Sequence, residues 1–292
     1  MIDYDYPLFR PPAEANNIII QVTLGCSYNN CSFCSMYKTK KYEVRKLEDV
    51  YKEIDTISRA YPATTKVFLA DGDALALPSE HLLTLLKYLQ KAFVKLRRVS
   101  LYASAQNILS KTQEELELLQ KNRLTLIYYG IETGSNLILK KITKGVGQSD
   151  IIESLNLASS SGIKISATVI LGIGGELYSN EHIEQTAKII NATRVNYLST
   201  LQLGLEEDAK DNFYKYFTDF TPLDDVQILQ EQKSFLEQLS PINKIIFRSN
   251  HASNALHLSG TLTKDTSRLV CELEEVLKIG QGAFISNAFR GF

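Results

Sequence analysis

Six short apolar strands alternate with amphipathic helices along the first 205 residues of this 292-residue chain. Most of these strands are continuous apolar runs, which is typical of a parallel sheet covered on both faces. The predicted strands are 18–24, 66–70, 99–103, 124–131, 164–171 and 195–203. The predicted helices are 46–60, 79–96 with Ser79 as its cap, 112–121, the pattern up to 161, and 180–191. This alternation predicts a parallel α/β sheet, and it leaves a barrel, a partial barrel and a doubly wound sheet open.

The pattern changes after Leu205. The stretch 206–221 is polar and aromatic, 225–239 and 263–277 predict helices, and 244–248 predicts one further strand. No linker rich in Pro, Gly or Ser separates this part from the repeats. We therefore predict an N-terminal extension at 1–16, a core at 17–205 and a C-terminal extension at 206–292 that packs on the core.

Composition excludes several classes of protein. Hydrophobic residues make up 44% and charged residues 22% of the chain, which suits a protein with a buried core. The net charge of −1 provides no general attraction to nucleic acid or anionic lipid. No apolar run is long enough to cross a bilayer, and the first residues lack the basic and apolar regions of a signal peptide. We expect a cytoplasmic protein without a membrane partner.

Three of the four cysteines lie within nine residues, directly after the first predicted strand. Cys26, Cys31 and Cys34 have the spacing Cys-x4-Cys-x2-Cys, whereas Cys271 is remote. Disulfide frameworks are spread along small secreted domains, so this clustering indicates a metal site instead. Three thiolates on one loop can bind three irons of a [4Fe–4S] cluster and leave the fourth iron open.

Zinc is the alternative for this loop. Structural zinc requires four ligands, and none of the four histidines lies near the triplet in sequence. A remote fourth ligand would be needed, so the ligand count disfavours zinc. Cys271 lies in a helical pattern among apolar residues and is predicted to be a small buried side chain.

The cysteine loop, with Phe33 before the third cysteine, resembles the signature of the radical S-adenosylmethionine (SAM) superfamily, with one residue more than usual between Cys26 and Cys31. Segments after later predicted strands resemble the same superfamily. The segment 129–135 (YGIETGS) closely resembles the branch of oxygen-independent coproporphyrinogen oxidase and the elongator catalytic subunit. The segments 70–73 (ADGD) and 169–175 (VILGIGG) lie where this superfamily has its SAM-binding turns.

This resemblance implies a set of site residues. The metal ligands are Cys26, Cys31 and Cys34. The residues implied to bind SAM are Phe33, Asp71, Gly72, Asp73, Glu132, Lys144, Thr168 and Ile173. By resemblance, the side chain of Asp73 and the carbonyls of Asp71 and Gly72 bind the amino group of methionine. Glu132 and Thr168 contact the ribose, Lys144 the carboxylate, and the segment with Ile173 the adenine.

The resemblance also implies a fold and a reaction. The fold is an α/β partial (β/α)6 barrel of the TIM type with a C-terminal α/β extension. The reduced [4Fe–4S] cluster cleaves SAM to methionine and a 5′-deoxyadenosyl radical, which abstracts hydrogen from a small or medium-sized metabolite. Such an enzyme is oxygen-sensitive and needs an electron donor such as flavodoxin or ferredoxin.

Two further groups of residues are candidates for binding. Asn250, His251 and Asn254 follow a predicted strand, and they either face the substrate or form turns and caps. Five basic residues follow the cysteine loop, and they either dock an acidic electron donor or form a solvated surface. These residues are Lys38, Lys40, Lys41, Arg45 and Lys46.

Two rival functions stay open. An RNA-modifying radical SAM enzyme is disfavoured by the neutral charge, because phosphate contacts need a basic surface. A non-catalytic metal-binding or redox-sensing protein would bind metal without cleaving SAM.

Only Cys271 remains outside the triplet, so a second cluster is not expected, and the segment before Cys26 is too short for a cobalamin domain. The pattern of residues does not identify the substrate.

Overall fold

The computed structural model describes residues 4–291, which form two compact units. The first unit contains residues 4–29, 36–129 and 156–165, and the second contains 30–35, 130–155 and 166–291. The cysteine loop is divided between them, because Cys26 belongs to the first unit and Cys31 and Cys34 belong to the second. No helix among residues 4–291 is both long and apolar enough to cross a bilayer.

Eight strands form one mostly parallel sheet in the order β1-β4-β5-β6-β7-β8-β9-β10. Their bounds are β1 Ile18–Gln21, β4 Lys66–Ala70, β5 Arg98–Ala103, β6 Leu124–Glu132, β7 Lys164–Leu171, β8 Tyr197–Gln202, β9 Ile245–Ser249 and β10 Leu258–Leu262. The pairing of β9 with β10 is antiparallel, whereas β8 and β9 are parallel. A separate antiparallel pair, β2 (Thr23–Leu24) and β3 (Glu43–Val44), brackets the cysteine loop.

Helices follow most of the strands, as the repeating pattern predicts. Their bounds are α1 Leu47–Ala60, α2 Ser79–Ala92, α3 Ala105–Leu109, α4 Gln113–Lys121, α5 Asn136–Lys141, α6 Gln148–Ser160, α7 Gly175–Ala192, α8 Glu207–Tyr216, α9 Asp225–Gln238 and α10 Thr266–Ile279. The α/β fold with a parallel sheet is therefore confirmed. The prediction that Ser79 caps its helix is wrong, because Pro78 is the N-cap residue and Ser79 begins the helix.

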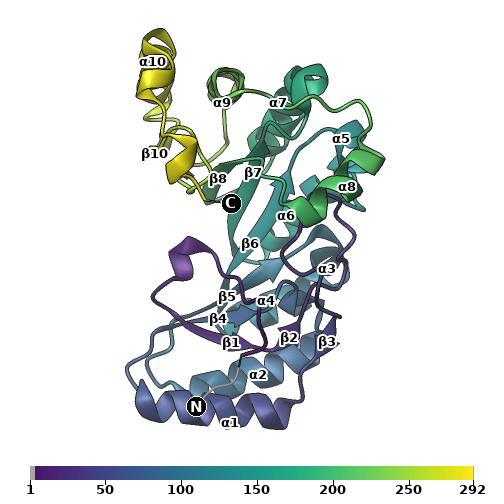
Figure 1. Ribbon diagram of the computed structural model, residues 1–292. Helices are drawn as coiled ribbons and strands as arrows, with labels where there is room; N and C mark the ends of the chain where they lie inside the picture. The colour runs from purple at the N-terminus through teal and green to yellow at the C-terminus, as the bar shows by residue number, and fades with distance from the viewer. Residues whose placement is uncertain (1–3, 292) are drawn as a thin grey trace. The chain divides into compact units, whose positions relative to one another are not determined.

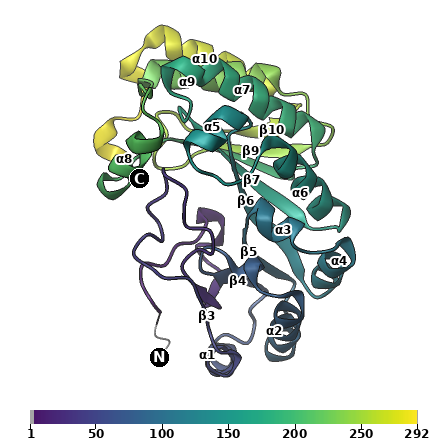
Figure 2. The ribbon, with the colours of Figure 1, turned by 90° about the vertical axis from the view of Figure 1, so that its right-hand side faces the viewer.

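The first unit has helices on one face of its strands and the N-terminal segment on the other (Figure 2). Ile19, Phe68 and Ala70 form a buried cluster on the N-terminal side, covered by Tyr4, Leu8, Tyr102 and Tyr128. Beside this cluster, the buried carboxylate of Glu14 accepts hydrogen bonds from the side chains of Arg98, Ser100 and Tyr128. These three contacts join the segment before β1 to β5 and β6.

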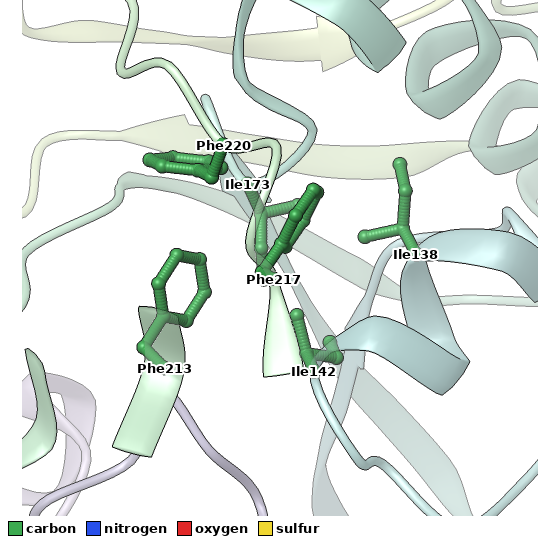
Figure 3. Packing of buried hydrophobic residues seen from close by; sticks show 6 residues of the cluster. All are labelled: Ile138, Ile142, Ile173, Phe213, Phe217 and Phe220. Carbon is green, nitrogen blue, oxygen red and sulfur yellow. The ribbon is translucent and has the colours of Figure 1, made fainter. Parts of the chain in front are cut away.

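The second unit has an aromatic core next to the end of β7. Its buried side chains are Ile138, Ile142, Ile173, Phe213, Phe217 and Phe220 (Figure 3). The aromatic rings come from α8, a helix that the sequence pattern did not predict, and from the segment that follows it. Helix α9 packs against both α7 and α10 in this unit (Figure 1).

Candidate functional site

The first half of the cysteine loop is tied to the end of β4. Gly25 has a φ of +71°, a conformation that glycine adopts without the strain of a Cβ atom. Its N–H donates to Oδ2 of Asp71 at 3.0 Å, and its carbonyl accepts from the N–H of Gly72 at 3.2 Å. The backbone before Cys26 therefore has a fixed position relative to the turn after β4.

The carboxylate of Asp71 accepts several of the hydrogen bonds that hold this part of the loop. It is fully buried and also accepts from Nε2 of Gln21 at 3.1 Å and from Nζ of Lys40 at 2.9 Å. Lys40 forms a second ion pair with Asp5 at 2.8 Å. These contacts give the side chain of Asp71 a structural role. The SAM contact expected of its backbone carbonyl stays a prediction.

Asp73 is the acidic side chain expected to bind the amino group of SAM. It accepts hydrogen bonds from Ser27, next to Cys26 in sequence, and from Nδ2 of Asn107. Burial raises the pKa of Asp73 to about 6, although the hydrogen bonds from Ser27 oppose this effect. Asn107 is presented by the short helix α3, whose first turn is capped by Ser104. Ser27 and Asn107 were not among the predicted site residues.

Gly72, between the two acids, has no space for a side chain. A Cβ atom there would lie 2.4 Å from the ring of Tyr37. The turn after β4 therefore requires glycine because the backbone approaches this ring closely, which the sequence alone did not indicate.

In the second unit, the backbone of the Cys31–Cys34 segment is held by the residues after α5. The N–H of Ser32 donates to the carbonyl of Ile142 at 3.0 Å, and Oγ1 of Thr143 donates to the carbonyl of Asn30 at 2.6 Å. Thr143 has a φ of +52°, so this connection follows an unusual backbone path. Ile142 and Thr143 were not predicted to support the cysteines.

Glu132 and Lys144 lie together as an ion pair, with Oε1 and Nζ 2.8 Å apart and both side chains mostly buried. Glu132 has a φ of +61°. A Cβ atom on Gly130 would lie only 2.0 Å from Oε1 of Glu132, so a side chain there would displace this carboxylate from its present position. The pair presents one positive and one negative group, which suits a polar ligand that carries both donors and acceptors.

The remaining residues implied to bind SAM lie near the end of β7. Ile173 is part of the buried core of the second unit (Figure 3). Phe33 packs against that core. Thr168 lies half-buried within β7 and pairs with Ser199 of β8. The SAM contacts of these three residues stay predictions.

The candidate substrate residues have different environments. Asn254 is buried, and its amide donates to the carbonyl of Thr200 at 2.9 Å and accepts from the N–H of Gln202 at 2.8 Å. These hydrogen bonds give Asn254 a structural role, which is the alternative to a side chain that faces the substrate. His251 is half-buried with its pKa lowered by burial, and Asn250 is exposed. A substrate role for these three residues stays a prediction.

Two expectations need correction. Lys40 and Arg45 do not belong to a free basic surface, because Lys40 pairs with Asp5 and Asp71, and Arg45 pairs with Glu53 at 2.5 Å. Lys41 and Lys46 are exposed. The prediction of a buried Cys271 is also wrong, since that side chain is exposed on α10.

The donor chemistry of the loop fits an iron–sulfur cluster. Cys26, Cys31 and Cys34 are all free of disulfides and half-buried. The hydroxyl of Ser32, between two of them in sequence, is buried without a hydrogen-bond partner, and a cluster sulfur would accept from it. Among residues 4–291, no three His, Cys, Asp or Glu side chains are gathered as a preformed metal site. The fit therefore rests on the thiols and on Ser32.

The fold and these motifs define an enzyme class that uses SAM and an iron–sulfur cluster. The sequence profile of the radical SAM superfamily matches residues 20–190, more than half of the chain. The chain belongs to the radical SAM superfamily. Enzymes of this superfamily bind a [4Fe–4S] cluster and SAM.

The similar proteins include transferases, synthases and an oxidase. A Methanocaldococcus jannaschii protein provisionally named a methylthiotransferase is 27% identical over 179 residues, covering 58% of this chain and 40% of that protein. Coproporphyrinogen III oxidase of Escherichia coli matches with a TM-score of 0.58 at 16% identity, covering 76% of this chain and 52% of that chain. Methylornithine synthase matches with a TM-score of 0.53 at 14% identity, covering 76% and 63%.

These similarities confirm the expected fold, and the profile match confirms the resemblance to the radical SAM superfamily; the similar structures include a coproporphyrinogen oxidase. At such low identity the solved structures show the fold alone. The chain spans about two fifths of the length of the first curated relative.

Proposed function

We propose that this enzyme holds a [4Fe–4S] cluster with Cys26, Cys31 and Cys34 and cleaves SAM reductively to act on a small or medium-sized metabolite. The observation that carries the proposal is that three half-buried cysteines outside any disulfide lie within the region that matches the radical SAM profile. The bound cluster and SAM supply a 5′-deoxyadenosyl radical that abstracts hydrogen from the substrate.

The protein's own residues bind and orient the amino-acid half of SAM in this proposal. Asp73 accepts hydrogen bonds from the ligand's amino group while Ser27 and Asn107 fix its carboxylate. With a pKa of about 6, Asp73 is mostly ionised at neutral pH. Lys144 offers its ammonium group to the ligand's carboxylate, and Glu132 accepts from the ribose hydroxyls.

Electrons would come from a reductant of the flavodoxin or ferredoxin type. Lys41 and Lys46 are exposed members of the basic group that follows the cysteine loop, whereas Lys40 and Arg45 are paired within the protein. Steering by two exposed lysines would affect the rate of association more than the affinity. Reversing their charge should slow reduction by flavodoxin and leave reduction by dithionite unchanged.

Anaerobic reconstitution tests the proposed function. The wild-type protein should bind about four irons per chain with the absorption of a [4Fe–4S] cluster. After reduction it should release 5′-deoxyadenosine from SAM. Cys26→Ala, Cys31→Ala and Cys34→Ala should each abolish both results, whereas Cys271→Ala, on an exposed cysteine, serves as the matched control. Zinc in the triplet, or a full cluster without 5′-deoxyadenosine, would overturn the proposal.

The similarity to a protein named a methylthiotransferase supports a second candidate, a group-transfer reaction started by the same radical. Analysis of SAM products separates the two candidates. Transfer of a methyl group from a second SAM would yield S-adenosylhomocysteine and a methylated product in addition to 5′-deoxyadenosine.

A further inference from the structure

The buried acid Glu231 lies outside all predicted motifs and contacts the segment that follows β7. It belongs to α9, in the part of the chain predicted as a C-terminal extension. Its Oε1 accepts from the N–H of Gly172 at 2.6 Å, and its Oε2 accepts from Oγ of Ser179 at 2.5 Å. The side chain is fully buried. Buried carboxylates are costly unless they are paired, so this arrangement needs a compensating role or partner.

The glycine at position 172 makes this approach of α9 possible. Gly172 has a φ of +78°, and a Cβ atom there would lie 2.5 Å from Cδ1 of Ile228. Ile228 and Glu231 are three residues apart on α9 and therefore project from the same side of the helix. One side of α9 thus contacts the turn that begins the segment 172–175.

His182 of α7 lies beside Glu231 and is hydrogen-bonded to the residue that follows β6. Its Nε2 lies 3.9 Å from Oε1 of Glu231, and its Nδ1 lies 2.8 Å from Oγ1 of Thr133. The N–H of Gly134 donates to Oγ1 of Thr186, one helical turn after His182. Thr133 and Gly134 belong to the motif that contains Glu132. Glu231 and His182, packed side by side, therefore each contact a different motif implied to bind SAM.

We propose that Glu231 and His182 are positioning residues that hold the Gly172 turn and the Thr133–Gly134 segment in the arrangement that binds the nucleoside half of SAM. This inference rests on the proposed function, because it assigns a task to residues behind the same site. Both side chains are fully buried, and each acts through the backbone segment that it contacts. Their effect is expected on SAM binding and not on the chemical step.

Equilibrium dialysis with SAM on the anaerobically reconstituted protein tests the inference. Glu231→Leu should raise the Kd for SAM at least about tenfold, because the amide of Gly172 loses a hydrogen bond to a charged group. The iron content and the rate of SAM cleavage at saturating SAM should stay within about twofold of wild type. Glu231→Gln retains an acceptor for Gly172 and should restore most of the affinity. Glu237→Leu is the matched control, because Glu237 lies on the same helix and pairs with Lys233 at the surface.

Hydrogen exchange of the Gly172 amide gives a second readout without any cofactor. The amide should be protected in the wild-type apoprotein and exchange faster in Ser179→Ala, a milder change that removes one of the two partners of Glu231. An unchanged exchange rate in Ser179→Ala, or an unchanged Kd in Glu231→Leu, would refute the inference. Failure of the wild-type protein to bind SAM would refute the proposed function instead, and the exchange result would still test the network.

Discussion

The replacement of Glu231 by glutamine should change how the stability of this protein depends on pH. Burial raises the pKa of Glu231 from its ordinary value of 4.5 to about 7. Between these two values the folded chain binds a proton that the unfolded chain does not bind. This carboxyl group therefore stabilises the folded state most below pH 4.5, and the contribution is lost as the pH rises through about 7.

The size of the effect follows from this difference in pKa. A shift of one pKa unit corresponds to about 1.36 kcal/mol, so the full contribution is about 3 kcal/mol. His182 works in the opposite direction, because burial lowers its pKa to about 3 and its protonation destabilises the fold in acid. The wild type and the Glu231→Gln variant both contain His182. Its contribution to the free energy of unfolding therefore largely cancels when the two are compared.

Urea unfolding of the full-length apoprotein between pH 5 and pH 8, under reducing conditions, measures this effect. The free energy of unfolding of wild type relative to Glu231→Gln should fall by about 2 to 3 kcal/mol across that range. Glu237→Gln, on the exposed side of α9, should follow the wild type at every pH. Parallel curves for the wild type and Glu231→Gln would show that Glu231 does not titrate as its burial requires.

Three further predictions concern other parts of the protein. Gly130→Ala should weaken SAM binding about tenfold by displacing Glu132 from Lys144, without loss of iron, as measured by dialysis and iron analysis. Asp73→Asn should weaken SAM binding to a similar extent, about tenfold, through loss of the negative charge, and an unchanged Kd would contradict its assigned role. Arg98→Met should destabilise the protein by about 3 kcal/mol in urea, because buried Glu14 loses its cation, whereas the exposed Arg97→Met should have little effect.

Continuous apolar strands are the part of the fold that sequence patterns predicted best. β4 and β7 begin and end where the predictions place them, because each starts at a lysine, is rich in apolar residues and ends at a turn. β10 was missed since only its two end residues are buried, which leaves no apolar run to detect. α8 was missed because its buried contacts depend on two residues, Ala209 and Phe213, in an otherwise polar and exposed helix.

At the candidate site, residues within short motifs could be predicted, whereas residues whose partners are distant in sequence could not. The cysteines, Asp73 and the Glu132 segment were found because each belongs to a short motif that follows a strand. Asn107 and Glu231 were not found, because nothing near them in sequence marks them as partners of a motif. Their partners lie 34 and 59 residues away, and only the folded chain brings these groups together.

Each motif at the candidate site is held by a residue outside that motif. Asn107 holds Asp73, Ile142 holds the backbone of Ser32, and Glu231 holds the turn at Gly172. A side chain that binds a ligand must have a fixed position before the ligand arrives, since ordering it during binding would cost affinity. The residues behind the motifs supply that order. We therefore expect substitutions at Asn107 and Glu231, which act through their side chains, to reduce SAM affinity although the motif residues are unchanged. If the motif residues alone determined the affinity, these substitutions would have no effect.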